Sequence, residues 1–206
     1  MNDFLFKARD GQTPLPKELR KGLKPKNVQT MGELDEYEEQ NIAEGLIWLE
    51  SSSRKCLDYI FWCELHKKLL SDVWEWAGEI RKHELSNPDF LHPKNIRTEL
   101  MKLIRDLEFW FENKTYPEQE IIARLHEKLL TIHPFANGNG RWSRILTEYI
   151  CKDKRITIPT WNNKLKDDPI RRRQEYIKAV EEARHNKNFE LLINNIFSKS
   201  YMNSPI

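Results

Sequence analysis

The sequence predicts an all-α domain with one short β-hairpin, and three observations support that prediction. Only 7 glycines occur in 206 residues, so turn residues are scarce and long helices are favoured. Apolar residues recur at helical spacing along most of the chain, which predicts about six to eight helices that each bury one stripe. Residues 78–93 are the only stretch with a composition typical of short strands, and we expect a flap there.

The elements follow in order from the N-terminus. Residues 1–32 hold a density of glycine and proline that no regular element tolerates, so we expect an extended arm. Residues 33–50 predict the first helix, because acidic residues precede its apolar positions and suit the positive end of a helix dipole. Those apolar positions are Leu34, Tyr37, Leu46 and Leu49.

Further helices are predicted from the stripes that follow. One helix opens behind Pro117 and Glu118, a pair typical of helix starts, and a break is expected at Pro159. The stripes are Leu57, Ile60, Phe61, Leu65, Leu69 and Val73; Ile96, Leu100, Leu103, Leu107 and Trp110; Ile121, Leu125, Leu129 and Ile132; Ile145, Leu146, Tyr149 and Ile150; Ile177 and Val180; and Leu192, Ile193, Ile196 and Phe197.

Composition narrows the class of protein. The 34 basic residues nearly balance the 32 acidic ones, which argues against a nucleic-acid carrier, and no apolar run approaches the about 18 residues of a membrane span. An odd number of cysteines, 3, and no secretory apolar core predict a cytoplasmic location. Cys56, Cys63 and His66 could suggest a metal cluster, but they lack a fourth partner, so buried thiols are the preferred interpretation.

The informative segment is residues 133–144, HPFANGNGRWSR, between two helical stripes. Gly138 and Gly140 allow a tight turn with exposed N–H groups, and a helix that begins directly afterwards directs unpaired donors and its positive end outward. Arg141 and Arg144 are three residues apart, so they share a helix face and could hold the outer phosphates of a nucleotide. His133 stands at the entrance, suited to accept a proton. A glycine turn that merely caps a helix is the alternative.

The whole string resembles the signature of the Fic/Doc family, H-x-F-x-[D/E]-G-N-G-R-x-x-R, with seven fixed positions in register. The arm, the segment VWEWAGEIR and the region around Tyr176 also resemble the Fic subgroup called mobile mystery protein B. The resemblance implies a Fic domain over residues 33–206. It also implies transfer of AMP from ATP, with Mg²⁺, to a Ser, Thr or Tyr hydroxyl of a target protein.

In that reaction the resemblance gives each motif residue a role. His133 would be the base. The phosphates would be held by the backbone N–H groups of Gly138, Asn139, Gly140 and Arg141 and by the Asn139 side chain. The outer phosphates of ATP would be fixed by Arg141 and Arg144. Phe135 is expected to anchor the loop in the core. Asn137 departs from the family pattern, where a carboxylate stands, so it is only a weak candidate Mg²⁺ ligand and reduced metal affinity is expected.

Regulation and docking follow from the same resemblance. Gln40–Gly45 reads QNIAEG and partly matches the family's inhibitory helix, so Glu44 is expected to pair with Arg144 and obstruct ATP; a solvated acid is the alternative. The flap, with Ile80, Leu85 and Phe90, is expected to bind an extended target segment by strand addition, although an ordinary hairpin fits equally. Trp74, Trp76 and Tyr176 are interpreted as core, and Arg171–Arg173 as a solvated face.

Other functions remain open at this stage. Loss of the carboxylate at Asn137 would fit a catalytically weak, toxin-like or nucleotide-binding module. Inverted binding of ATP would give a phosphotransferase, as in the Doc branch. Family analogy also suggests a small helix-turn-helix, antitoxin-like partner.

Overall fold

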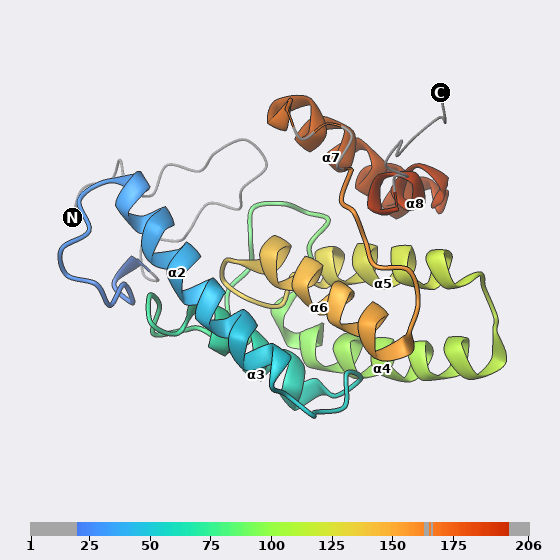
Figure 1. Ribbon diagram of the computed structural model, residues 1–206, viewed down its shortest axis with the longest axis horizontal. Coiled ribbons are helices and arrows are strands. Elements are labelled where there is room, and N and C mark those ends of the chain that lie inside the picture. The colour runs from blue at the N-terminus through green and yellow to red at the C-terminus, as the bar shows by residue number, and fades with distance from the viewer. Residues whose placement is uncertain (1–19, 163–164, 166, 198–206) are drawn as a thin grey trace, which may run out of the picture.

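The computed structural model describes residues 20–162, 165 and 167–197 and is mostly helical, as predicted (Figure 1). The greater part of the expected arm, residues 1–19, lies outside the described residues. Seven α-helices occur in the described part of the chain: α2 (Met31–Glu50), α3 (Tyr59–Leu70), α4 (Ile96–Asn113), α5 (Glu118–Ile132), α6 (Asn139–Lys154), α7 (Pro169–Asn186) and α8 (Glu190–Ile196). A short 3-10 helix, η2 (Pro93–Asn95), precedes α4.

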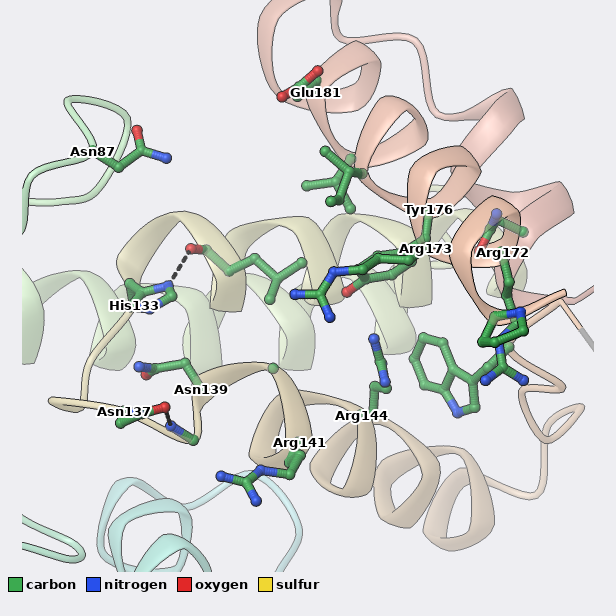
Figure 2. Close-up of a pocket in the computed structure, with 18 of the residues that line it drawn as sticks. Asn87, His133, Asn137, Asn139, Arg141, Arg144, Arg172, Arg173, Tyr176 and Glu181 are labelled. Carbon is green, nitrogen blue, oxygen red and sulfur yellow. Dashed lines mark hydrogen bonds between the residues drawn. The ribbon is translucent and has the colours of Figure 1, made fainter. Parts of the chain in front are cut away.

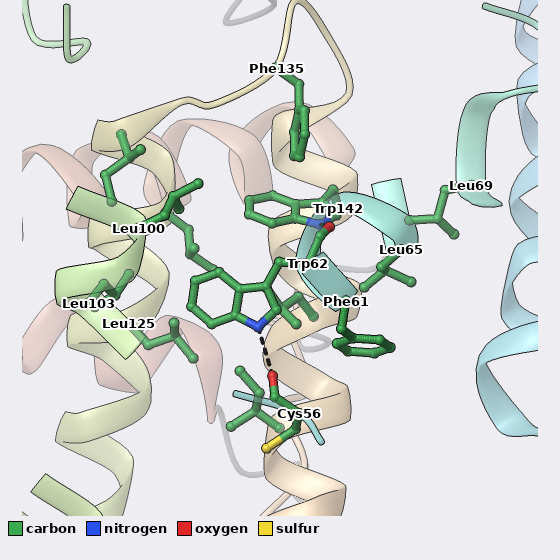
Figure 3. Packing of buried hydrophobic residues seen from close by; sticks show 14 of the residues in the cluster. Cys56, Phe61, Trp62, Leu65, Leu69, Leu100, Leu103, Leu125, Phe135 and Trp142 are labelled. Carbon is green, nitrogen blue, oxygen red and sulfur yellow. Dashed lines mark hydrogen bonds between the residues drawn. The ribbon is translucent and has the colours of Figure 1, made fainter. Parts of the chain in front are cut away.

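Helix α5 lies at the centre of the arrangement and contacts α4, α6, α7 and α8. Helix α2 packs along α3 on one side, whereas α7 and α8 form a separate pair on another side (Figure 1). The core between α3, α5 and α6 is aromatic, with Trp62 and Trp142 buried side by side (Figure 3). Their indole N–H groups donate to the carbonyls of Cys56 and Trp62, so burial leaves neither donor unpaired.

The first helix begins two residues earlier than predicted, because a capping box fixes its start. The Thr30 hydroxyl accepts from the Glu33 N–H at 3.2 Å, and the Glu33 carboxylate accepts from the Thr30 N–H at 3.0 Å. The expected burial of Tyr37 and Leu46 is wrong, because these residues are 42% and 39% exposed. The buried face instead runs through Leu34, Glu38, Asn41, Gly45 and Leu49. Ile60, which belongs to the next predicted stripe, is 60% exposed.

Gly45 explains how closely α2 approaches α3. A Cβ atom at this position would lie 2.8 Å from the Lys68 carbonyl oxygen, so no larger residue fits without separating the helices. Asn41 strengthens the same contact, since its side-chain amide donates to the Lys68 carbonyl at 3.2 Å and its oxygen accepts from the Asp72 N–H at 2.9 Å. The packing fixes the rotation of α2 and therefore decides which of its acids face the rest of the protein.

The predicted β-hairpin over residues 78–93 is not formed, since none of these residues is in a strand. The physical reason is that the ends of the segment bond to the α5–α6 region rather than to each other. The Arg81 N–H donates to the Pro134 carbonyl at 2.9 Å, and the Leu91 N–H donates to the Thr131 carbonyl at 3.0 Å. We call residues 78–93 the flap; it is an irregular loop fixed beside the motif.

None of the three cysteines forms a disulfide. Cys56 and Cys151 are buried, as expected of structural thiols, whereas Cys63 is only half-buried. Burial raises the pKa of Cys56 and Cys151 to about 12, so they are protonated and unreactive at neutral pH. Within the described residues no group of three or more His, Cys, Asp or Glu side chains is placed to hold a metal ion. No helix of this part of the chain has both the length and the apolar character needed to cross a bilayer.

Candidate phosphate-binding site

The loop between α5 and α6 turns sharply at its first residue. His133 caps α5 in the left-handed region, with φ of 47°, an unfavourable conformation for a side chain without a special reason. The reason here is Arg81, whose side chain is 4% exposed and whose Nε donates to the His133 carbonyl at 2.7 Å. The same guanidinium donates to the carbonyls of His83 and Leu91 in the flap. Arg81 therefore fixes the loop and the flap together.

Asn139 holds the middle of the loop, and this corrects the expectation that its side chain binds phosphate. Its side-chain oxygen accepts from the Phe135 N–H at 2.9 Å, and its amide donates to the Phe135 carbonyl at 2.8 Å. The residue is 2% exposed, so its side chain is fully used inside the loop. Phe135 is completely buried between His66 and Trp142, which confirms its predicted role as the anchor of the loop.

His66 is a supporting residue that sequence reasoning considers only as a metal ligand. Its Nδ1 accepts from the Gly78 N–H at 2.9 Å, so the proton lies on Nε2, which donates to the Asn137 carbonyl at 3.0 Å. Complete burial lowers the pKa of His66 to about 3 and keeps the ring in this neutral form. The interaction fixes the backbone one residue before the glycine turn.

The turn itself depends on Gly138. Its φ is 75°, and a Cβ atom there would lie 2.5 Å from a methyl carbon of Leu70, so glycine is required both by conformation and by space. Gly140 differs, because a Cβ atom at that position would meet nothing within 4 Å. That open space lies at the first turn of α6, so a ligand can approach the backbone closely there.

Helix α6 begins without a side-chain cap. The N–H groups of Asn139, Gly140 and Arg141 are the first three of the helix and have no acceptor within it. They stand at the positive end of the helix dipole, which favours an anion. The start of α6 therefore has backbone geometry that suits an anion.

His133 lines the cavity in front of this helix end (Figure 2). Its Nδ1 lies 3.2 Å from the Leu130 carbonyl, so it is the nitrogen that carries the proton and Nε2 keeps a lone pair. Phe90 of the flap stacks on the imidazole with ring centroids 3.8 Å apart. Burial, together with the charges of Arg81 and Arg184, lowers the pKa of His133 to about 3, so the ring is neutral at pH 7.

The two motif arginines have different surroundings. Arg141 donates to the Glu38 carboxylate of α2 at 2.7 Å, and that carboxylate also accepts from the Trp74 indole at 2.7 Å. Arg144 lies instead against the faces of Trp161 and Tyr176, at 5.9 and 4.9 Å from their ring centroids. Both side chains line the cavity, as the motif predicts.

The expected pair between Glu44 and Arg144 is not formed. Glu44 is exposed, accepts from Gln40 at 3.2 Å, and lines a separate shallow hollow beside Asn41 and Asp72. The reason is the rotation of α2 fixed at Gly45, which turns Glu38 toward the motif and leaves Glu44 about 100° around the helix from the buried face. The acid that reaches a motif arginine is therefore Glu38.

The cavity measures about 820 Å³ and is closed opposite α6 by one face of α7 (Figure 2). Sequence reasoning misses this wall, because it interprets Arg171–Arg173 as solvated and Tyr176 as core. Only the helical spacing of Arg173, Ile177, Val180 and Arg184 could have shown that these residues share a face. That face lines the cavity, together with Arg172, Tyr176 and Glu181.

The residues present fit a protein-held magnesium ion poorly. At the motif position where a carboxylate is expected, Asn137 offers a neutral amide whose oxygen already accepts from the Gly138 N–H at 2.6 Å. Magnesium in proteins is held mainly by carboxylates together with substrate phosphates and water. Of the acids that line the cavity, Glu38 is committed to Arg141 and Trp74.

The described part of the chain is a helical domain in which the uncapped start of α6 lies beside a neutral histidine. Residues 56–151 match the model of the Fic/DOC family. The chain therefore carries a Fic/DOC family domain, and its motif is the loop described above.

Two curated relatives and one solved structure show the extent of the similarity. A probable protein adenylyltransferase Fic of Salmonella typhimurium is 27% identical in an alignment of 146 residues; the match covers 59% of this chain and 69% of the relative. The probable protein adenylyltransferase y4lH of Sinorhizobium fredii is 28% identical in an alignment of 126 residues; the match covers 56% of this chain and 62% of the relative. The Bartonella tribocorum effector BepC, solved with AMPPNP, has a TM-score of 0.64 at 18% identity and covers 88% of this chain and 96% of its own.

Proposed function

We propose that the chain is a protein adenylyltransferase that transfers AMP from ATP to a Ser, Thr or Tyr hydroxyl of a target protein. One observation carries the proposal: the uncapped start of α6 opens into a cavity of about 820 Å³ that His133, Arg141 and Arg144 also line. The names of the two relatives support the same reaction class. ATP as the substrate is supported by the AMPPNP bound to the structurally similar BepC.

In this proposal His133 is the general base. With the proton of Nδ1 directed at the Leu130 carbonyl, Nε2 can accept the proton of the target hydroxyl. The hydroxyl oxygen forms a bond to the α-phosphorus, and the bond from that phosphorus to the bridging oxygen breaks, releasing pyrophosphate. Bound phosphate charge raises the pKa of the imidazole above its value in the empty site, which strengthens the base when substrate is present.

The backbone N–H groups of Asn139, Gly140 and Arg141 would stabilise the charge that develops on the phosphate oxygens. Arg141 and Arg144 would fix the outer phosphates by their guanidinium forks. Magnesium would bind together with the nucleotide, held mainly by its phosphates, and Asn137 is only a weak candidate ligand. No step is assigned to it, because the donors in the site do not form a carboxylate cage.

Docking of the target is proposed at the flap. Phe90 is half-buried against His133, and Ile80 and Leu85 are half-buried on the same segment. A target segment seated along this loop would bring its hydroxyl to the imidazole. We also propose a helix-turn-helix, antitoxin-like partner, on the basis of the family resemblance alone.

A catalytically weak nucleotide-binding module is the second candidate, and Asn137 is the observation that favours it. Transfer of the terminal phosphate, as in the Doc branch, is the third. Intact-mass spectrometry distinguishes them: the protein and a cell extract are incubated with ATP and Mg²⁺, and modified proteins gain AMP, gain phosphate or remain unchanged. Addition of AMP by the wild type and not by His133→Ala is the expected result, and labelling that survives in His133→Ala contradicts the proposal.

A further inference from the structure

Helix α7 forms one wall of the cavity. Arg173, Ile177, Val180 and Arg184 follow one another at intervals of four, three and four residues, so they form one helix face. All four line the cavity in front of α6. Arg171 lies on another face of α7, where it is 65% exposed and bound to Glu175 at 2.9 Å. Neighbouring arginines of α7 are therefore in different environments.

Arg173 has an unsatisfied donor inside the cavity wall. Its Nε is buried, and no described residue accepts a hydrogen bond from it. A buried guanidinium N–H without an acceptor is unfavourable, so a shift of this side chain toward an acceptor on a ligand in the cavity would be favourable. The close-up shows the guanidinium of Arg173 extending into the cavity near Arg144 (Figure 2).

The balance of charge in the site indicates what that ligand is. Arg141 is already partly neutralised by Glu38 at 2.7 Å, and Arg184 is held by Asp89 at 3.1 Å. Asn137 supplies no negative charge with which to hold a divalent cation beside the phosphates. A polyphosphate in this cavity therefore depends on the cations that remain available to it.

We propose that Arg173 is a third phosphate-binding arginine, which takes up charge on the outer phosphates of a nucleoside triphosphate and makes its binding largely independent of a divalent cation. A guanidinium is always charged and matches phosphate oxygens with two parallel N–H groups, so it can replace part of the neutralisation that a metal provides. The inference rests on the proposed function, since it assigns a residue to the same nucleotide site.

The test is calorimetric titration of ATP into the full chain, in buffer with Mg²⁺ and in buffer with EDTA. The wild type is expected to lose less than about threefold in affinity when Mg²⁺ is removed. Arg173→Gln is expected to bind at least about tenfold more weakly in EDTA, as befits the loss of a charge-assisted hydrogen bond. Arg173→Lys, which keeps the charge and loses the fork, is expected to lie between the two.

Arg171→Gln is the matched control, because it removes the same charge from the same turn of α7 outside the cavity, and its affinity should equal that of the wild type. Melting temperatures of all variants show that each is folded. If the wild type binds ATP and Arg173→Gln binds it equally in both buffers, the inference is overturned and the proposed function stands. A wild type whose affinity collapses in EDTA also overturns it. If the wild type binds no ATP in either buffer, the proposed function fails, and the inference fails with it.

Discussion

Helix α2 contacts the candidate site through the ion pair between Glu38 and Arg141, and we expect Glu38 to compete with phosphate for this arginine. The substitution Glu38→Gln keeps an oxygen to accept from the Trp74 indole but removes the charge that holds Arg141. A hydrogen bond to a charged group contributes about 1.5–3 kcal/mol. Arg141 is 37% exposed, so the lower value applies, and releasing the guanidinium should tighten ATP binding by about tenfold.

The assay is calorimetric titration of ATP into Glu38→Gln and into Glu44→Gln as the control. Glu44 is exposed and bonds only to Gln40 among the described residues, so its substitution should leave the affinity unchanged. Glu38→Gln should also melt a few degrees lower, since a loss of about 1 kcal/mol shifts the midpoint by about 2–4 °C in a protein of this size. Weaker ATP binding by Glu38→Gln would refute the reasoning, because it would mean that Glu38 orients Arg141 for the phosphates instead of competing with them.

Three further outcomes are expected. In an NMR titration of the free protein, the His133 imidazole should still be neutral when the pH has been lowered to about 5. Phe90→Ala should raise the titration midpoint of His133 toward the ordinary value of about 6.5, because the stacked ring of Phe90 no longer excludes water. A wild-type midpoint near 6.5 would contradict the site geometry. Gly138→Ala should lower the free energy of unfolding by about 2–4 kcal/mol in a denaturant melt, because a Cβ atom does not fit there. Gly140→Ala should keep the wild-type stability but bind ATP more weakly. Equal losses of stability in the two variants would contradict this contrast. Arg184→Met should remove the ion pair with Asp89 and make the flap more mobile, which hydrogen exchange measures as faster amide exchange at residues 89–91. Unchanged exchange would argue against the ion pair between Arg184 and Asp89.

The stability of the fold should also decrease in mild acid. The folded-state pKa values of His66, His126 and His133 are all lowered to about 3 by burial, so between about pH 6.5 and pH 3 the unfolded chain binds more protons than the folded one. Lowering the pH from 7 to 5.5 should cost about 1 kcal/mol for each histidine. Thermal melts across this range measure the loss. A melting temperature that does not fall between pH 7 and 5.5 would show that the three rings are not held neutral.

The helices and the motif loop could be predicted from the sequence because both depend on local chemistry. The start of α5 behind Pro117 and the glycine turn each follow from residues within a few positions of one another. The capping box of Thr30 and Glu33 is equally local, but the predicted helix start at residue 33 misses it. The burial of Phe135 is predictable as well, since exposing a large apolar side chain to water beside a polar turn is unfavourable.

The orientation of one helix against another could not be predicted in the same way. The partial match QNIAEG points to Glu44, but the rotation of α2 is fixed by the close approach at Gly45 and by the bonds of Asn41 to α3 and the residues after it. These contacts join residues 27 and 31 positions apart, which no local pattern records. Glu38, which lies earlier in the same helix, pairs with the motif residue Arg141, whereas the partial motif match predicts that Glu44 pairs with a motif arginine.

The cavity wall shows the same difference between local and non-local information, with a consequence for function. Arg171, Arg172 and Arg173 are consecutive in a polar helix, and composition alone treats them as equivalent. Docking of α7 on α5 separates them, so that Arg171 meets solvent and Glu175, whereas Arg173 faces the helix end that begins at Asn139. A substitution in the motif, such as the amide at Asn137, can therefore be offset by a residue far along the chain that belongs to no motif. Whether the site still binds nucleotide has to be judged from the charges gathered around the whole cavity, and the comparison of Arg173→Gln with Arg171→Gln measures that directly.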